Sequence, residues 1–427
     1  MRRRVVLSLF WVCLGAAAGD QNGFGQAAAA QVRQDKDPRT AQAWERRAAT
    51  VQSRYYAVRS DLDMAVTRRL AAHMDLISEE YMRLLRGLRQ RRQSQRPRIW
   101  LFRSREAYLS TLSLKFEADP AGTSGMSLRK GTEITLAAWQ GPKPEKALMR
   151  VLRHEGFHQF KELYFPNMPP WVNEGLAEVF EAAVVLESGI ILGQVEAGWT
   201  ALLAESARRD ALIPIDRLFQ LDEEDWQDNV KAGRGALQYA EAWSVIHFLI
   251  FGERRRYLPS FERFLVLMNQ GRSWRSAFQQ SFGVHDLEPF GQRWLAYLRD
   301  LSPTDFESTV ARLEFLAAGL LAARGDGVEP ATFAQLQSAL RRMSFQYDTH
   351  RFGIRRRLGA EDPSVFLVPG PGGGRSPAAF VLRQTGRGSG RTRSVFTQGL
   401  APLEFGIVWE PDPSGVDPKW QLLSEIR

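Results

Sequence analysis

The sequence predicts an α+β fold, in which a small mixed β-sheet leads into a helix that carries the candidate active site and then into a mainly helical part. Short runs rich in β-branched and aromatic residues, bounded by turn residues, occur before residue 140. From Glu145 to about Met343, apolar residues recur at the three- and four-residue spacing of helices. After Pro363 short apolar runs return among Gly, Pro and Arg, which predicts a small C-terminal tail that is either β-structured or partly disordered.

The N-terminus has the pattern of a secretory signal peptide. Arg2, Arg3 and Arg4 precede an apolar run that ends in small residues at Gly19. We therefore expect residues 1–19 to direct export to the periplasm or the medium, with an uncleaved N-terminal anchor as the alternative. The single cysteine, Cys13, lies inside this segment, so the mature chain would have no disulfide. Residues 20–50 are predicted to be a linker.

A strand, a long helix and a second strand are expected next. Ser53–Val58 contains two tyrosines and a valine and is predicted to be a short strand. Ser60 or Asp61 is expected to cap a helix whose apolar residues recur every three or four positions as far as Leu88. Arg98–Phe102 is predicted to be the second strand.

The candidate site follows a further helix and strand. Ser104 is expected to cap a short helix, and a Gly-rich turn precedes a predicted strand at Thr132–Ala138. Glu145–Tyr164 has the pattern of a helix, and a proline-bearing loop separates it from a new helix that starts near Trp171.

Three domains are expected after the linker. Helical patterns continue in the second half of the chain, at Leu237–Phe251, Tyr257–Asn269 and Leu287–Leu301. We expect a catalytic domain at 51–301, a helical extension at 302–362, and a Pro/Gly linker with a β-like tail at 363–427.

The formal net charge is +9, and one stretch is notably basic. Arg83 to Arg98 contains seven arginines and no acid. It is a candidate contact for an anionic envelope surface, although such a run at a helix end is more often simply solvated. Aromatic residues do not alternate with these arginines, which disfavours nucleic-acid binding.

The sequence His154-Glu155-Gly156-Phe157-His158 carries the candidate chemistry. On a helix, residues four apart lie on one face about 6 Å apart along the axis, so both imidazoles can reach one Zn²⁺. Glu155 is rotated by about 100° and flanks the metal, where it can exchange protons with a water molecule. The alternative is a pair of ordinary helix histidines.

A catalytic zinc site needs a third protein ligand, and Glu174 is the candidate. It lies in the next predicted helix, after a turn long enough to bring that helix back against the first. Glu178 is one turn further on the same face and can support a ligand imidazole, most plausibly His154, by accepting a hydrogen bond from its outer nitrogen.

These two motifs resemble those of the gluzincin metallopeptidases, which include thermolysin-like enzymes and one-zinc aminopeptidases. The resemblance covers about 30 residues and implies zinc at His154, His158 and Glu174, with Glu155 as general base. It also implies that Glu178 supports the first histidine, and that an edge strand before the motif helix lines the substrate cleft. Thr132–Ala138 is expected to be that strand. The chain lacks the family's Gly-x-Met-x-Asn sequence for binding a free amine, so aminopeptidase activity is not expected.

The family also implies a Tyr or His that donates a hydrogen bond to the developing oxyanion. Tyr239 is our candidate, although a tyrosine on an apolar helix face is more often a core residue. Tyr164 is a weaker candidate. His247 lies between apolar residues and is predicted to be packed, and no useful neighbours are expected for three other histidines, His73, His285 and His350.

The sequence therefore predicts a zinc-dependent hydrolase that cleaves peptide bonds in a peptide or protein substrate. Glu155 and Tyr239 are the expected catalytic residues. Two alternatives remain open: a zinc-binding structural or interaction module of the cell envelope without turnover, and a hydrolase of cell-wall amides.

Overall fold

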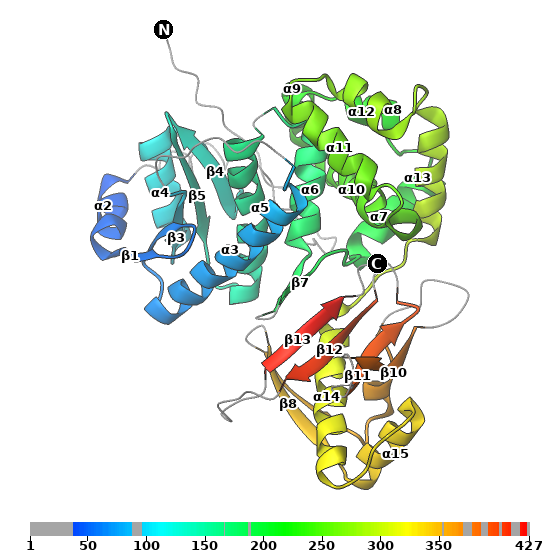
Figure 1. Ribbon diagram of the computed structural model, residues 1–427. Coiled ribbons are helices and arrows are strands. Elements are labelled where there is room, and N and C mark those ends of the chain that lie inside the picture. The colour runs from blue at the N-terminus through cyan, green and yellow to red at the C-terminus, as the bar shows by residue number, and fades with distance from the viewer. Residues whose placement is uncertain are drawn as a thin grey trace. The chain divides into compact units, whose positions relative to one another are not determined.

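The computed structural model describes residues 37–87, 96–165, 167–186, 189–351, 354–369, 378–385, 392–400, 404–410 and 419–424. The fold is mixed α/β, with a small mixed sheet on the N-terminal side followed by helices, which confirms the predicted class (Figure 1). The predicted signal peptide lies outside the described residues. No helix among the described residues is long and apolar enough to cross a membrane.

The chain divides into two compact units. Unit 1 comprises Met1–Glu181, Ala211–Leu249 and Tyr257–Gly291, and unit 2 comprises Ala182–Asp210, Ile250–Arg256 and Gln292–Arg427. These units are drawn differently from the predicted domains at 51–301, 302–362 and 363–427, because Ala182–Asp210 and Ile250–Arg256 group with the C-terminal part. Local sequence patterns carry no information about such long-range packing.

Unit 1 contains a five-stranded mixed sheet of order β1-β2-β3-β5-β4. Its strands are β1 (Ala49–Gln52), β2 (Ala57–Ser60), β3 (Arg98–Phe102), β4 (Gly125–Lys130) and β5 (Glu133–Trp139). Strand β2 pairs parallel with β3 and β3 pairs parallel with β5, whereas β1 and β4 are antiparallel to their neighbours.

The edge strand beside the helix that carries His154 and His158 is β4. The prediction that Thr132–Ala138 forms this edge strand is therefore corrected. The predicted segment forms β5, which lies inside the sheet between β3 and β4. Gly131, with a φ of 66°, reverses the chain between the two strands. The Gly-rich stretch expected to be only a turn therefore contains the edge strand.

Helices cover both faces of this sheet (Figure 1). On one face α4 (Arg105–Phe116) packs its Tyr108 in a cluster with Phe102 of β3 and Ala137 of β5. On the other face lie α3 (Met64–Leu84) and α5 (Glu145–Tyr164). The side chain of Leu136, next to Ala137 in β5, faces Gly156 of α5. Alternate residues of β5 thus face opposite helical layers.

Residues within the predicted linker form helix α2 (Pro38–Arg47) and strand β1, so the linker prediction fails for this part. Asp37 caps the helix by accepting hydrogen bonds from the amides of Arg39 and Thr40. Trp44 is fully buried, stacks on Phe102 and donates a hydrogen bond to a β3 carbonyl. Burial of this one large side chain ties α2 to the sheet.

The start of α3 also differs from the prediction. Asp63 caps the helix, whereas the Ser60 hydroxyl accepts hydrogen bonds from Leu62 N–H and the Thr67 hydroxyl. The predicted strand Ser53–Val58 is interrupted by a turn, because the carboxylate of Asp75 accepts the Arg54 and Tyr55 amides there. In contrast, β3 and the Ser104 cap of α4 are as predicted.

The helical part of unit 1 surrounds an aromatic cluster. Its helices are α6 (Pro170–Glu181), α8 (Ile215–Gln220), α9 (Glu223–Lys231), α10 (Gly235–Arg255), α11 (Leu258–Asn269), α12 (Trp274–Phe282) and α13 (Glu288–Asp300), of which α10 and α13 continue into unit 2. Trp171 of α6 stacks on Phe219 of α8 with ring centroids 4.0 Å apart, and Phe264 of α11 also stacks on Trp171, at 6.0 Å. This cluster fixes the position of α6.

In unit 2, the C-terminal strands and the helices α14 and α15 share one hydrophobic core. It contains α7 (Ala197–Arg208), α14 (Phe306–Gly325), α15 (Phe333–Arg342), the hairpins β6 (Val184–Leu186) with β7 (Gly189–Ile191) and β8 (Gln346–Arg351) with β9 (Ile354–Gly359), and the short helix η1 (Pro363–Phe366). The tail contributes a four-stranded antiparallel sheet: β10 (Ala379–Thr385), β11 (Thr392–Gln398), β12 (Phe405–Glu410) and β13 (Lys419–Ser424). Phe405 packs edge to face on Phe306, so the sheet shares the core of α14.

Candidate metal centre

Helix α5 carries His154, Glu155 and His158 at its centre. All three side chains are buried, and the two imidazole rings lie edge to face with centroids 4.8 Å apart. Gly156, between the two histidines, lets α5 pack closely against α3. A Cβ at this position would lie 2.5 Å from the end of Met74 and 3.1 Å from the Tyr81 hydroxyl. The four-residue spacing therefore places both imidazoles on one buried side of the helix, as predicted.

Helix α6 brings Glu174 to the same point. Its Oε2 lies 3.8 Å from His154 Nε2 and 3.5 Å from His158 Nε2. Ligand atoms of a tetrahedral zinc site with bonds of about 2.0–2.1 Å lie roughly 3.4 Å apart. The three predicted ligand atoms thus converge at nearly the spacing that a single zinc ion requires.

Asn173 orients two of these ligands at once. Its Oδ1 lies 3.0 Å from His158 Nδ1, and its Nδ2 donates a hydrogen bond of 2.7 Å to Glu174 Oε1. The amide oxygen favours a proton on Nδ1, which leaves the lone pair of His158 Nε2 directed at the centre. Sequence reasoning missed this residue. Its position beside Glu174 was visible, but its contact with α5 depends on how the two helices pack.

The outer nitrogen of His154 faces two carboxylates, and the nearer one is not the predicted one. Glu181 Oε2 lies 3.1 Å from His154 Nδ1, whereas Glu178 Oε1 lies 3.7 Å away, beyond ordinary hydrogen-bond distance. Glu181 also pairs with Arg150 at 3.0 Å. Glu181 follows Glu174 by two helical turns, so its spacing could have identified it.

Charge in this buried cluster favours a bound cation. Burial lowers the pKa of His154, but the hydrogen bond to Glu181 and the charges of nearby glutamates outweigh it and raise that pKa to about 10. Burial raises the pKa of Glu181, yet its contacts with His154 and Arg150 lower it to about 2. Burial raises the pKa of Glu174 well above its ordinary range, although the His154 charge opposes this. A divalent cation among these carboxylates would relieve the cost of their burial.

Glu155 is fully buried beside this point. Neither carboxylate oxygen has a side-chain hydrogen-bond partner among the described residues. Burial raises its pKa to about 7, while the charge of His154 and the backbone of Ser127 act in the opposite direction. Strand β4 runs close by, since a Cβ on Gly125 would lie 3.1 Å from Glu155 Cγ. The carboxylate therefore lies between the candidate ligands and the edge strand.

Tyr239 of α10 lies within electrostatic reach of the centre. Burial raises the pKa of its hydroxyl well above the ordinary value, and the charge of Glu174 raises it further. Its ring packs edge to face on Trp226, with centroids 5.5 Å apart. The position is compatible with either a packed tyrosine or a hydrogen-bond donor, so the catalytic role remains a prediction.

The other residues considered from the sequence lie elsewhere. Tyr164 is half-buried and packs against Phe160 with the two rings tilted, and His247 packs against Trp243. His285 is exposed, and the side chain of His350 lies outside the described residues.

His73 was expected to have no useful neighbour, and this is wrong. Arg153 Nη1 lies 3.5 Å from its Nε2, and both side chains are buried. The same guanidinium donates hydrogen bonds to the carbonyls of Phe180 and Glu181. Arg153 thus links α3 and α5 to the C-terminal end of α6, where it also complements the helix dipole.

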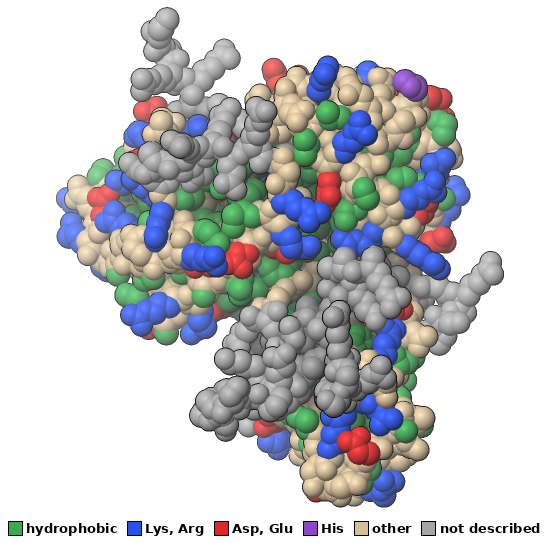
Figure 2. Space-filling model, in the orientation of Figure 1, with side chains coloured by type: hydrophobic (Ala, Val, Ile, Leu, Met, Phe, Trp, Pro, Cys, Tyr) green, Lys and Arg blue, Asp and Glu red, His purple; other side chains and the backbone are tan. Residues whose placement is uncertain are grey.

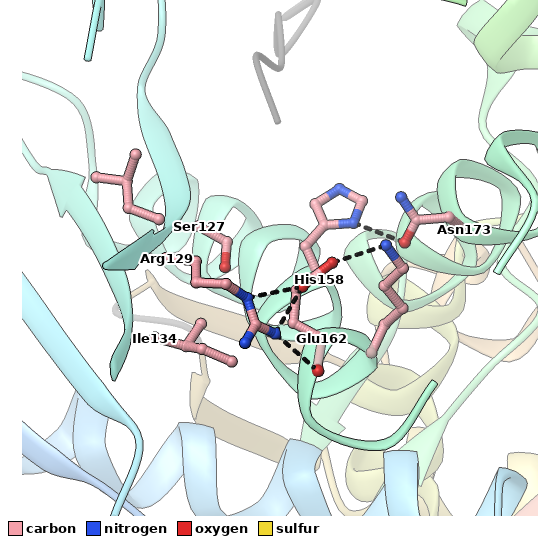
Figure 3. A pocket seen from close by; sticks show the side chains of 8 residues that line it. Ser127, Arg129, Ile134, His158, Glu162 and Asn173 are labelled. Atoms are coloured by element: carbon pink, nitrogen blue, oxygen red, sulfur yellow. Dashed lines mark hydrogen bonds and ion pairs between the residues drawn. The ribbon is translucent and has the colours of Figure 1, made fainter. Parts of the chain in front are cut away.

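A pocket opens beside His158. It is lined by Ser127, Leu128, Arg129, Ile134, His158, Lys161, Glu162 and Asn173. Figure 3 shows Ser127 and Arg129 on the strand side and His158, Glu162 and Asn173 on the helical side. The candidate centre therefore has a small neighbouring space that is lined by charged and polar side chains.

The basic stretch Arg83–Arg98 is only partly described. Arg83 pairs with Glu80, Arg86 lies 3.7 Å from Glu262, and Arg98 pairs with Glu133 at 2.7 Å. On the face shown in Figure 2, Lys and Arg side chains are spread among neutral and apolar ones. Contact with an anionic surface stays a prediction for this stretch.

Comparison with known protein families gives a match to part of the chain. A family described as "Protein of unknown function (DUF1570)" matches residues 149–265. A search of the curated proteins found no match to the chain. The matched segment contains His154, Glu155, His158, Glu174 and Tyr239, so all the predicted site residues fall within it.

Proposed function

We propose that this protein is a zinc-dependent hydrolase that cleaves peptide bonds. The observation that carries the proposal is the convergence of His154 Nε2, His158 Nε2 and Glu174 Oε2 within 4.8 Å of one another, beside the buried carboxylate of Glu155. A structural zinc site would use four protein ligands, whereas three ligands with a flanking carboxylate are typical of hydrolytic sites.

The donor set fits zinc. Two imidazoles and one carboxylate are the ligands of thermolysin-type sites, and Glu174 Oε2 is a buried oxygen that has no hydrogen-bond partner among the described residues. The orienting contacts of His154 and His158 with Glu181 and Asn173 also match the support that metal-bound imidazoles usually have. When bound there, zinc would act as a Lewis acid and lower the pKa of a water molecule.

The side chains of this chain would then divide the proton transfers. Glu155 accepts a proton from the water and delivers it to the leaving amine, a role suited to a carboxyl group whose pKa is about 7. Tyr239 stays protonated at neutral pH because its pKa is raised, so it can donate a hydrogen bond to the developing oxyanion. Strand β4 has no neighbour on its outer side among the described strands, so its backbone can pair with an extended peptide.

The proposal is tested with purified full-length chain by metal analysis and a broad cleavage screen of peptides, casein and purified cell wall. We expect one zinc per chain and peptide cleavage. Glu155→Gln should lower kcat by about 10²–10⁴-fold while zinc is retained, because it removes only the proton acceptor. Glu145→Gln, in the first turn of the same helix, where the carboxylate pairs with Arg69, is the matched control.

The other outcomes identify the alternatives. Cleavage of cell wall but not of peptides would assign the amide hydrolase. Stoichiometric zinc with no turnover on any substrate would assign the binding module. Absence of zinc from the wild type would contradict the whole proposal.

A further inference from the structure

The pocket beside His158 contains more positive than negative charge. Arg129, from the edge strand β4, and Lys161, one turn after His158 on α5, contribute two cations, and Glu162 is the only carboxylate among the lining residues. Apart from the candidate ligand His158, the other lining side chains are uncharged. The lining therefore has a net charge of +1.

The cations are only partly neutralised by Glu162. Arg129 Nη2 donates to Glu162 Oε2 at 2.8 Å, and Lys161 Nζ donates to Oε1 at 2.9 Å. Lys161 is 9% exposed, and this is its only hydrogen bond among the described residues. An ammonium group has three N–H donors, so two remain for a ligand or water in the pocket.

A buried hydroxyl adds a further donor. Ser127 is 7% exposed, and its Oγ has no hydrogen-bond partner among the described residues. Leaving such a group unsatisfied is costly, so a ligand oxygen or a water molecule in the pocket would gain a hydrogen bond there. Ile134, the partner of Arg129 in the β4–β5 pair, supplies an apolar wall beside these donors.

We propose that Lys161, Arg129 and Ser127 form a subsite for a carboxylate group of the substrate, directly beside the candidate ligand His158. The inference rests on the proposed function, and it names the substrate class: peptides with an anionic group next to the scissile bond. The carboxylate belongs either to an Asp or Glu side chain or to the C-terminus of a short peptide. An aliphatic stem would pack on Ile134 while its carboxylate accepts hydrogen bonds from the two cations.

The test measures binding of peptide hydroxamates to the zinc-loaded Glu155→Gln chain by calorimetry, so that turnover is not required. One pair of probes carries Asp or Asn beside the hydroxamate with an amidated C-terminus. A second pair carries Leu with a free or an amidated C-terminus. We expect about 10- to 100-fold tighter binding of the anionic member of one pair, and the pair that shows it identifies the source of the carboxylate.

Two substitutions separate recognition from a structural ion pair. Lys161→Met keeps the length of the side chain and should reduce the preference to roughly threefold or less. Glu162→Gln should increase it, because the lining charge rises from +1 to +2 when one carboxylate is removed. Lys146→Met, on the same helix but outside the pocket, should retain the wild-type preference. Thermal unfolding checks that each variant is folded.

Two results would overturn the inference and are distinguishable. Equal binding of all four hydroxamates shows that the subsite does not select anions, while zinc binding and the proposed function stand. Failure of the chain to bind zinc or any hydroxamate contradicts the proposed function, and the subsite falls with it.

Discussion

Glu181 and Glu178 compete for one nitrogen of His154, and their distances favour Glu181. The Glu181 carboxylate is 0.6 Å nearer (3.7 minus 3.1), and Arg150 holds it in place from the other side. A carboxylate at this position orients the imidazole and strengthens it as a ligand. The resemblance to gluzincins implied Glu178, so the two residues offer a direct comparison.

Glu181→Gln should weaken zinc affinity by about 10- to 100-fold, because the charge that supports His154 is lost. Glu178→Gln, a matched change one turn away, should have a smaller effect. Competition with a chromophoric chelator at pH 7 measures both. A larger loss for Glu178→Gln would show that the more distant carboxylate supports the histidine.

Glu241 of α10 is a buried carboxylate to which the proposed proton transfers assign no role. It accepts a hydrogen bond from Ile213 N–H at 2.8 Å, but its Oε2 has no partner among the described residues. Burial raises its pKa from 4.5 to about 8, and the Ile213 contact only partly opposes this. Between pH 4.5 and about 8, the folded chain therefore keeps a proton on Glu241 that the unfolded chain has lost. This lowers the free energy of unfolding as pH rises from about 4.5 to 8, with no further change above.

Glu241→Gln should remove this contribution. Wild type and variant should be about equally stable near pH 5, and the variant should be more stable at pH 9 by about 1–4 kcal/mol. Urea unfolding at both pH values measures the difference, and Glu224→Gln, an exposed acid on α9, is the control. A difference that does not vary with pH would contradict the predicted protonation.

At the scale of elements, close packing of α6 on α10 brings Tyr239 near Glu174. A Cβ on Gly175 would lie 2.5 Å from both the Ala242 carbonyl oxygen and Ile246 Cγ1 of α10. Only glycine allows this approach without a shift of one helix. Gly175 thus sets the distance between Glu174, the candidate ligand next to it, and Tyr239, which lies one turn before Ala242 on α10.

Gly175→Ala should destabilise the chain by about 1–3 kcal/mol, because the backbone of α10 must move away. It should also lower kcat for any substrate that the wild type cleaves, since Tyr239 moves with α10. Gly198→Ala in α7, where no atom lies within 4 Å of the added Cβ, is the control and should be neutral or stabilising by up to about 1 kcal/mol. Chemical unfolding measures the stability of both variants. If Gly175→Ala has the same free energy of unfolding as the wild type and as Gly198→Ala, this account is contradicted.

At the scale of the whole molecule, the candidate centre belongs to one unit alone. His154, His158 and Glu174 all lie in unit 1, together with the Glu181 and Asn173 that orient them. The core of unit 2 is built separately from α14, β6 and the tail sheet. Metal binding is therefore expected to stabilise unit 1 directly and unit 2 only indirectly.

Chelation of zinc should reduce amide protection in α5 and α6 and leave α14 and β10–β12 unchanged. At free zinc 1000 times above Kd, binding would contribute about 4 kcal/mol to the stability of the unit that holds it. Hydrogen exchange measured by mass spectrometry, with and without chelator, resolves the two units. An equal loss of protection in both would show that they unfold together.

The sequence by itself determined the parts of the site that depend on local geometry. The bounds of α5, Glu145–Tyr164, follow from its apolar spacing, and the four-residue step places His154 and His158 on one side of it. The proline-bearing loop and the position of Glu174 in the next helix were sufficient to identify the third candidate ligand, whose carboxylate lies near both imidazoles. Each of these features is a helical repeat or a short turn. A few neighbouring residues are enough to specify such a feature.

Only the tertiary structure decided which residues surround these ligands. Asn173 and Glu181 reach the two imidazoles because of the angle between α5 and α6, which the aromatic cluster around Trp171 and the contact at Gly175 set together. The edge position of β4 depends on which side of β5 was already occupied by β3. Such choices depend on contacts between residues far apart in the chain, and local spacing does not encode them.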